Sequence, residues 1–200
     1  MGHQPFILGV FGPLGSGKST VCDMLAENGF VVWKADDAVS ELYASGGQGA
    51  KRVGEYFGKQ FLSSSGAVLK GRLTRLVLNS RAKFRILEHL IHPLVVNHAQ
   101  HWIDAMKRKG KHCLALEAAV FDGDGLGRFP HMYLRVSASR EICKKRVLQR
   151  RKSSSYFDFL SAKMRDYPSE IEIVNDVSKL HLKKAFAKAF SKITIALDGT

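Results

Sequence analysis

The sequence contains no apolar run that approaches the length of a membrane-spanning helix. Its first residues, MGHQPFILGVF, have neither the basic leader nor the small-residue cleavage site of a signal peptide. Its three cysteines, Cys22, Cys113 and Cys143, are odd in number and far apart, which argues against a disulfide framework and against a zinc site. We therefore expect a cytoplasmic protein that has no membrane partner.

Recognition signatures for nucleic acid are also lacking, since there is no RNA-recognition motif, zinc finger or helix-turn-helix pattern. The charge is nevertheless strongly positive: 31 Lys and Arg residues against 18 Asp and Glu residues give a formal net charge of +13. Such an excess attracts polyanions, and phosphorylated small molecules satisfy it as well as nucleic acid does. We expect small anionic ligands and no nucleic-acid partner.

Residues 12–19 read GPLGSGKS and match the G-x-x-x-x-G-K-[ST] pattern of a phosphate-binding loop. An apolar run at 6–11 precedes the loop, and a helical pattern from Ser19 to about Asn28 follows it. This order of strand, loop and helix is the one that the motif requires, and it disfavours a simple glycine-rich turn with a surface lysine. The glycines allow backbone N–H groups to turn toward phosphates at the positive end of the helix.

The loop predicts a site for ATP and Mg²⁺. Lys18 is expected to reach the β- and γ-phosphates, and the Ser19 hydroxyl is expected to be a ligand of Mg²⁺. The expected nucleotide-binding residues of the loop are Gly12, Pro13, Leu14, Gly15, Ser16, Gly17, Lys18, Ser19 and Thr20.

Strand-like and helical patterns alternate along much of the chain, which predicts an α/β fold with a parallel sheet between layers of helices, as in P-loop NTPases. The predicted strands are 6–11, 30–33, 113–117, 131–136 and 171–174. The predicted helices that accompany them are 19–28, 36–44, 139–152 and 178–195. A chain of 200 residues suffices for one domain with a hydrophobic core.

Two segments interrupt the alternation. Residues 48–110 are predicted to be almost wholly helical, with short breaks at 63–66 and 79–80 and a kink or restart at Pro93. We expect an inserted acceptor-binding subdomain at about 46–110. Residues 152–168 are expected to form a small mobile lid.

Carboxylates follow two of the predicted strands. Asp36 and Asp37 come directly after 30–33, and the carboxyl ends of parallel strands face the ligand. One of the two, Asp36, is expected to accept a proton from an acceptor hydroxyl, and the other to cap the next helix, although position alone leaves open that both serve only as caps. Glu117 ends the strand at 113–117 and Asp122 follows it, and either could help to hold Mg²⁺ through water. The alternative for both is a solvent-facing loop carboxylate, which is the plainer interpretation of Asp122.

Three further residues are candidates whose pattern alone is ambiguous. Arg146 and Arg150 lie four positions apart on one face of a basic helix, where they suit either charge stabilisation of a transferring phosphoryl group or an exposed basic surface. His92 precedes Pro93 in the helical block, and a single histidine there is usually structural.

The order of these motifs resembles that of the dephospho-CoA kinase family, over about residues 6–182. GPLGSGKST is similar to the loop of that family, and VVWKADDAV is similar to its second-strand signature. LEHLIHPLV, KKRVLQR and IVNDVSKLHL resemble three further segments of the family.

The resemblance implies transfer of the ATP γ-phosphoryl group to the ribose 3′-hydroxyl of dephospho-CoA, giving coenzyme A and ADP. It implies catalytic roles for Lys18, Asp36, Arg146 and Arg150, and it implies that Asn175 lies near the adenine of the nucleotide. The implied substrate-binding residues are Asp36, Lys70, His92, Glu117 and Asp122. We expect a monomer or a weak homo-oligomer.

The chain also departs from the family pattern. Lys34 stands where the family has an aspartate, and Phe159 and Lys163 align with an arginine and a glutamine of the lid. Asp122 replaces a glutamate, and Lys70 stands where arginine is usual. These departures keep two alternatives open: a related small-molecule kinase with a different acceptor, and a non-catalytic nucleotide-binding module.

Overall fold

The computed structural model describes residues 4–150, 154–161 and 167–198. The chain divides into two compact units, the first formed by Met1–Trp33 with Asp104–Thr200 and the second by Lys34–Ile103. Among the described residues, no helix combines the length and the hydropathy that crossing a bilayer requires.

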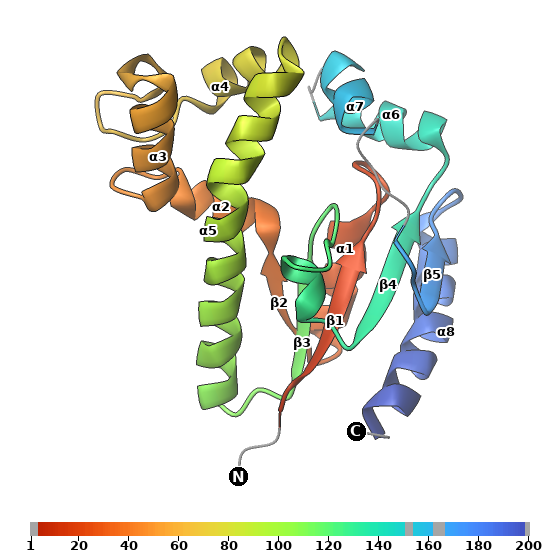
Figure 1. Cartoon of the computed structure of the whole chain (residues 1–200). Helices are drawn as coiled ribbons and strands as arrows, with labels where there is room; N and C mark the ends of the chain where they lie inside the picture. Colours follow the sequence, from red (N-terminus) through yellow and green to blue (C-terminus); the bar gives the residue numbers. More distant parts are fainter. Residues whose placement is uncertain (1–3, 151–153, 162–166, 199–200) are drawn as a thin grey trace. The chain divides into compact units, whose positions relative to one another are not determined.

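A five-stranded sheet organises the first unit (Figure 1). Its strands are β1 (Phe6–Phe11), β2 (Val31–Lys34), β3 (Cys113–Glu117), β4 (Met132–Ser137) and β5 (Ile171–Val174), in the spatial order β2-β3-β1-β4-β5. The central strand β1 pairs in parallel with β3 and β4, so that Leu8 lies opposite Ala115 on one side and Met132 on the other. The predicted α/β fold with a parallel central sheet is confirmed.

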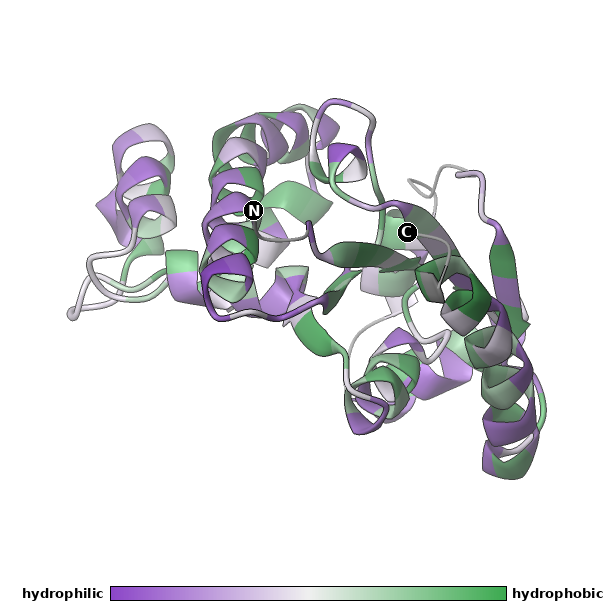
Figure 2. Cartoon of the chain, turned by 90° about the horizontal axis from the view of Figure 1, so that it is seen from below, coloured by the Kyte–Doolittle hydropathy of each residue, from purple (hydrophilic) through white to green (hydrophobic). Residues whose placement is uncertain are grey.

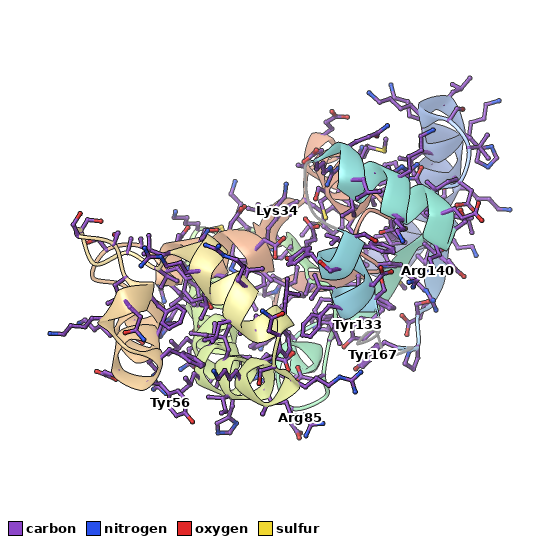
Figure 3. The ribbon with its side chains drawn as sticks, turned by 90° about the horizontal axis from the view of Figure 1, so that it is seen from above. Lys34, Tyr56, Arg85, Tyr133, Arg140 and Tyr167 are labelled. Atoms are coloured by element: carbon purple, nitrogen blue, oxygen red, sulfur yellow. The ribbon has the colours of Figure 1, made fainter. Side chains whose placement is uncertain are left out.

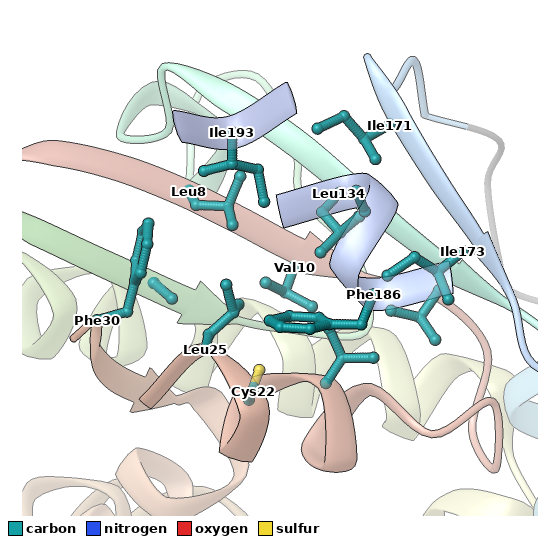
Figure 4. Packing of buried hydrophobic residues seen from close by; sticks show 14 of the residues in the cluster. Leu8, Val10, Cys22, Leu25, Phe30, Leu134, Ile171, Ile173, Phe186 and Ile193 are labelled. Carbon is teal, nitrogen blue, oxygen red and sulfur yellow. The ribbon is translucent and has the colours of Figure 1, made fainter. Parts of the chain in front are cut away.

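The main core lies on one face of this sheet, under α1 (Lys18–Glu27) and α8 (Lys179–Asp198) (Figure 4). Alternate residues of β1 point into it, because successive side chains of a strand lie on opposite faces. Full burial of each large aliphatic side chain stabilises the fold by about 1.5–3 kcal/mol. The side chains that the helices contribute to this cluster include Val21, Cys22, Leu25, Leu182, Phe186, Ala189 and Ile193.

The strands are mostly hydrophobic along their length, whereas the helices carry both hydrophobic and hydrophilic residues (Figure 2). Every residue of β1 is buried, which matches a central strand that is covered on both faces. On the face opposite α1 and α8, the rings of Phe11, Phe121, Tyr133 and Tyr167 pack together. Tyr133 and Tyr167 lie side by side with ring centroids 4.9 Å apart (Figure 3).

Among the described residues, the first unit also contains η2 (Leu126–Arg128), α6 (Arg140–Gln149), α7 (Ser154–Ser161) and the last residues of α5 (Arg81–Arg108). Both α6 and α7 lie beyond the carboxyl ends of the strands (Figure 1). The helix predicted at 139–152 corresponds to α6, which ends at Gln149 with Arg150 as its C-cap, whereas residues 151 and 152 lie outside the described residues.

The second unit is helical, with α2 (Ala35–Leu42), α3 (Gln48–Phe57), η1 (Lys59–Phe61), α4 (Lys70–Leu78) and most of α5 (Arg81–Arg108). The predicted break at 63–66 is present, but the interruption between α3 and α4 is wider than predicted and contains η1. There Gly58 and Gly66 take positive φ angles of 100° and 85°, and Leu62 forms an antiparallel bridge with Val68.

Pro93 lies inside α5, which continues through it, so the expected restart at this residue was wrong. Proline removes one backbone donor from a helix. The helix continues because Ile91, Leu94 and Val95, which flank the proline, are all buried and hold this turn in place.

Small shifts at other boundaries have local causes. The second strand begins at Val31 and not at Phe30, because the N–H of Phe30 donates to the carbonyl of Leu25 and closes the end of α1 after Gly29. The fourth strand is displaced by one residue, to Met132–Ser137, and the last helix extends to Asp198.

Candidate functional site

The glycines of the loop at 12–19 give its backbone an unusual shape. Gly12, Gly15 and Gly17 have φ angles of 145°, 86° and 104°, which only glycine adopts without strain. Gly17 is the N-cap of α1, so the positive end of that helix begins at the loop. Within the loop, the N–H of Ser16 donates to the carbonyl of Pro13 at 3.1 Å.

Lys18 is folded back across its own loop. Its Nζ donates to the carbonyl oxygens of Gly12 at 3.0 Å and Pro13 at 3.3 Å. Backbone carbonyls are weaker partners for an ammonium group than phosphate oxygens are, because phosphate carries a full charge. The side chain is therefore placed so that a phosphate at the loop can exchange for these carbonyls.

The side-chain oxygens of Ser19, in the first turn of α1, and of Glu117, at the carboxyl end of β3, lie close together. The Ser19 hydroxyl donates to Oε1 of Glu117 at 3.1 Å. A hydroxyl and a carboxylate are hard oxygen donors of the kind that Mg²⁺ prefers, and Mg²⁺ usually has few protein ligands beside phosphates and water. In the described ranges, no three His, Cys, Asp or Glu side chains gather as a metal site of their own.

Asp122 has a local role in the structure. Its Oδ1 accepts a hydrogen bond from the N–H of Leu126 at 3.2 Å, and its carbonyl accepts from the N–H of Gly127 at 2.8 Å. These contacts cap the turn that contains η2. The side chain itself is exposed.

Arg146 and Asn175 both reach the backbone of the loop. Arg146 donates to the carbonyls of Gly15 at 3.2 Å and Ser16 at 3.4 Å, and to the carbonyl of Asn175 at 3.0 Å. The amide of Asn175 donates to the same Ser16 carbonyl at 2.7 Å, and Asn175 is only 7% exposed. The structure thus brings the predicted residues Arg146 and Asn175 to the loop, whereas Arg150 is exposed at the end of α6.

The described part of the predicted lid packs on α6 and on the loop. Asp158 of α7 forms ion pairs with Arg140 at 2.5 Å and Lys144 at 3.7 Å, and Arg140 extends from α6 in Figure 3. Phe157 is buried in a small cluster with Cys143 and Val147, against which Leu14 of the loop packs. Phe159 lies in α7, whereas Lys163 lies outside the described residues.

Cys143 lies within this cluster, with its Sγ donating to the carbonyl of Ala138 at 3.6 Å. Burial raises the pKa of its thiol, although the nearby charge of Arg146 acts in the opposite direction. A buried thiol with a raised pKa is a poor nucleophile, so Cys143 fits a packing role.

The second unit contains the other predicted site residues. Asp36 and Asp37 are both exposed in the first turn of α2, and neither caps it, because its N-cap is Lys34 without a side-chain bond. The Nζ of Lys70 donates to the Ser40 hydroxyl at 2.9 Å, and that hydroxyl donates to the carbonyl of Asp36 at 2.8 Å. The predicted residues Asp36 and Lys70 are thus linked through Ser40.

Two features of the second unit were not predicted. Ser40 had no sequence signal beyond its place one turn after Asp36. Glu41 of α2 contacts His98 of α5 at 3.0 Å, so this side-chain pair links the two helices. His92, the histidine that was predicted to bind substrate, is half-buried in α5 one residue before Pro93.

Comparison with known proteins identifies the family to which the chain belongs. The sequence profile of the family described as dephospho-CoA kinase matches residues 6–165. The chain is 30% identical to a dephospho-CoA kinase from Shewanella oneidensis over 145 residues, which cover 72% of this chain and 69% of that protein.

Solved structures share the fold. TT1252 from Thermus thermophilus superposes with a TM-score of 0.73 at 22% identity, over 95% of this chain and 98% of that one. A dephospho-CoA kinase from Campylobacter jejuni superposes with a TM-score of 0.60 at 19% identity, over 96% and 98% of the two chains. Because the family profile spans most of the sequence, the chain belongs to the dephospho-CoA kinase family.

Proposed function

We propose that the protein transfers the γ-phosphoryl group of ATP to the ribose 3′-hydroxyl of dephospho-CoA, giving ADP and coenzyme A. Membership of the family makes the protein a kinase, with a nucleotide and a small molecule as substrates. The observation that carries the proposal is the complete loop, in which Lys18, Ser19 and the glycine backbone are arranged around the start of α1. The net charge of +13 suits two polyanionic substrates.

In this proposal the first unit holds ATP. The loop N–H groups and Lys18 bind the β- and γ-phosphates, and Asn175 lies near the adenine. Ser19, with Glu117 beside it, holds Mg²⁺, which when bound neutralises charge on the β- and γ-phosphates. Arg150 stabilises the negative charge that the moving phosphoryl group carries.

The second unit supplies the acceptor side of the reaction. Asp36 accepts the proton of the ribose 3′-hydroxyl. At the same time the ribose oxygen bonds to the γ-phosphorus, and the bond between that phosphorus and the leaving oxygen of ADP breaks. Lys70 keeps the backbone at Asp36 in place through Ser40, and with His92 it offers partners for the anionic acceptor. A carboxylate is suited to the role because it can accept a proton, whereas an amide of the same shape cannot.

An acceptor assay tests the proposal. The purified protein is incubated with MgATP and with dephospho-CoA, and ADP and the new 3′-phosphate are measured. Lys18→Ala is the inactive control, because it removes the charge that meets the phosphates. ATP binding without any phosphorylation of dephospho-CoA would contradict the proposal. Turnover on a nucleoside or another alcohol in place of dephospho-CoA would point to the related kinase with a different acceptor.

A further inference from the structure

Arg146 is directed at backbone carbonyl oxygens. Its two terminal nitrogens donate to the carbonyls of Gly15, Ser16 and Asn175, at 3.2, 3.4 and 3.0 Å. An arginine offers five donors in a planar fork, which suits several acceptors that lie in one plane. Hydrogen bonds from a charged donor are stronger than those between neutral groups, so Arg146 holds the loop more firmly than a neutral side chain could.

The carbonyl of Ser16 is the point where these contacts meet. It accepts from Arg146 and from the Asn175 amide at 2.7 Å, and a carbonyl oxygen has two lone pairs. The backbone N–H of Asn175 donates to the carbonyl of Ser137, which places Asn175 at the end of β4 and β5. The Ser16 carbonyl oxygen therefore connects the loop both to α6, through Arg146, and to the end of the edge strand β5, through Asn175.

The direction of one carbonyl sets the direction of the next N–H. In a trans peptide the C=O of one residue and the N–H of the following residue point in opposite directions. With the Ser16 carbonyl turned toward Arg146 and Asn175, the N–H of Gly17 must point away from them. Gly17 is the N-cap of α1, where N–H groups are available to an anion.

The packing of the loop glycines agrees with this arrangement. A Cβ at Gly15 would lie 2.5 Å from the carbonyl of Cys143 in α6, and a Cβ at Gly17 would collide with the amide of Asn175. The loop thus lies in direct backbone contact with the two elements that hold it, and neither glycine leaves space for a side chain.

We infer that Arg146 is a positioning residue for the phosphate-binding loop: it fixes the Gly15 and Ser16 carbonyls so that the Gly17 N–H is set for a phosphate before nucleotide arrives. Asn175 shares this role through Ser16. Neither role needs contact with the transferring phosphoryl group. The inference rests on the proposed nucleotide-binding function and is independent of the acceptor.

ADP affinity distinguishes positioning from charge stabilisation of the transferred group, because ADP has no γ-phosphate. Arg146→Met keeps a long side chain but removes every donor. We expect it to raise the dissociation constant of a fluorescent ADP analogue about tenfold or more, which is the loss of one to two charged hydrogen bonds. We also expect KM for ATP to rise by a similar factor, with kcat at saturating ATP reduced only a few-fold. Arg146→Lys should give an intermediate ADP affinity.

Arg140→Met is the matched control, because Arg140 lies on the same helix and binds Asp158 of α7 and not the loop. Its ADP affinity should stay within about twofold of wild type. The inference would be overturned if Arg146→Met kept normal ADP affinity and lost kcat. Because ADP binding needs no acceptor, inactivity toward dephospho-CoA would leave this result unaffected.

A double-mutant cycle gives a second test, which also serves if Arg146→Met does not fold. Asn175→Ala removes the other donor to the Ser16 carbonyl and keeps the Asn175 carbonyl that Arg146 contacts. It should weaken ADP binding alone, and combined with Arg146→Lys it should cost less than the two single changes predict, because both side chains act on one atom. Normal ADP affinity in Asn175→Ala, or strictly additive losses, would contradict the inference.

Discussion

The hydroxyl of Ser19 donates to a carboxylate oxygen of Glu117 at 3.1 Å, across 98 positions of sequence. Ser19 belongs to the first turn of α1, and Glu117 is the last residue of β3. The contact places a carboxylate beside the residue that is proposed to hold Mg²⁺, so Glu117 is positioned to orient that hydroxyl or to bind a coordinated water.

Glu117→Gln is therefore expected to weaken Mg²⁺ use selectively. The amide keeps the size of the side chain and removes its charge, and changes to the outer shell of a metal site typically cost about 10–100-fold in metal affinity or activity. We expect the Mg²⁺ concentration for half-maximal rate to rise by about tenfold or more. ADP binding without metal should be unchanged. A rate profile against Mg²⁺ identical to wild type would remove Glu117 from the metal site.

Asp36 and Asp37 offer a matched pair, since both are exposed in the first turn of α2. Asp36→Asn should leave ATP binding nearly intact and lower kcat by about 10²–10⁴-fold, the usual contribution of a positioned general base. Asp37→Asn removes the same charge one residue away and should stay within a few-fold of wild type. Equal rates for the two variants would dismiss Asp36 as the base.

Gly15 and Gly29 form a second matched pair, because both have positive φ, at 86° and 91°, but only Gly15 is crowded. Gly29→Ala, with nothing within 4 Å of the new Cβ, should cost only the backbone strain of about 1–2 kcal/mol. Gly15→Ala would place its Cβ 2.5 Å from the Cys143 carbonyl, which adds about 1–3 kcal/mol of overpacking.

Urea denaturation of the two glycine variants measures this difference, and ADP binding should be lost only in Gly15→Ala. Equal losses of stability would mean that α6 moves away from the loop at little cost. In that case the close contact between the loop and α6 would not contribute to the free energy of unfolding.

Tyr43 predicts a pH dependence of stability. Burial raises the pKa of its phenol from 10.0 to about 12, so the folded state holds this proton more tightly than the unfolded state does. The stabilisation is complete below pH 10 and is lost as the pH rises toward 12, by about 3 kcal/mol in total. In urea titrations at pH 9 and at pH 11.5, Tyr43→Phe should lose less stability between the two pH values than wild type. Equal losses would show that the phenol does not contribute.

The parts that could be predicted from sequence are those with a local pattern. The loop was located by its glycines and lysine. Three strands were predicted at their observed bounds, because β1 and most of β3 are short apolar runs and β5 alternates buried and exposed residues. The family relationship followed from the order of such segments, and the profile match confirms it. The order of segments is enough to recognise the family. It does not test the roles of single residues, so the proton-accepting role of Asp36 and the substrate-binding role of His92 stay predictions.

The parts that could not be predicted are of two kinds. In one, a helical spacing of apolar residues competes with a glycine that ends the helix; in the other, the contact is made to a backbone atom. Phe57 and Phe61 are spaced as in one helix, yet Gly58 between them takes a positive φ and ends α3. Arg146 and Asn175 were recognised as site residues, but their shared partner is the carbonyl of Ser16. Every residue has a backbone carbonyl, so the sequence does not indicate which one accepts these hydrogen bonds.

The partners of the Ser16 carbonyl also bear on the order in which the site can form during synthesis. The glycine motif leaves the ribosome early, but Arg146 and Asn175 follow it by 130 and 159 positions. A nascent chain that ends before α6 has the whole motif and lacks both Arg146 and Asn175, and a chain that ends before β5 still lacks Asn175. We therefore expect high-affinity nucleotide binding to be acquired only when β5 has paired with β4, so that the nucleotide binds the folded protein and not the glycine motif by itself.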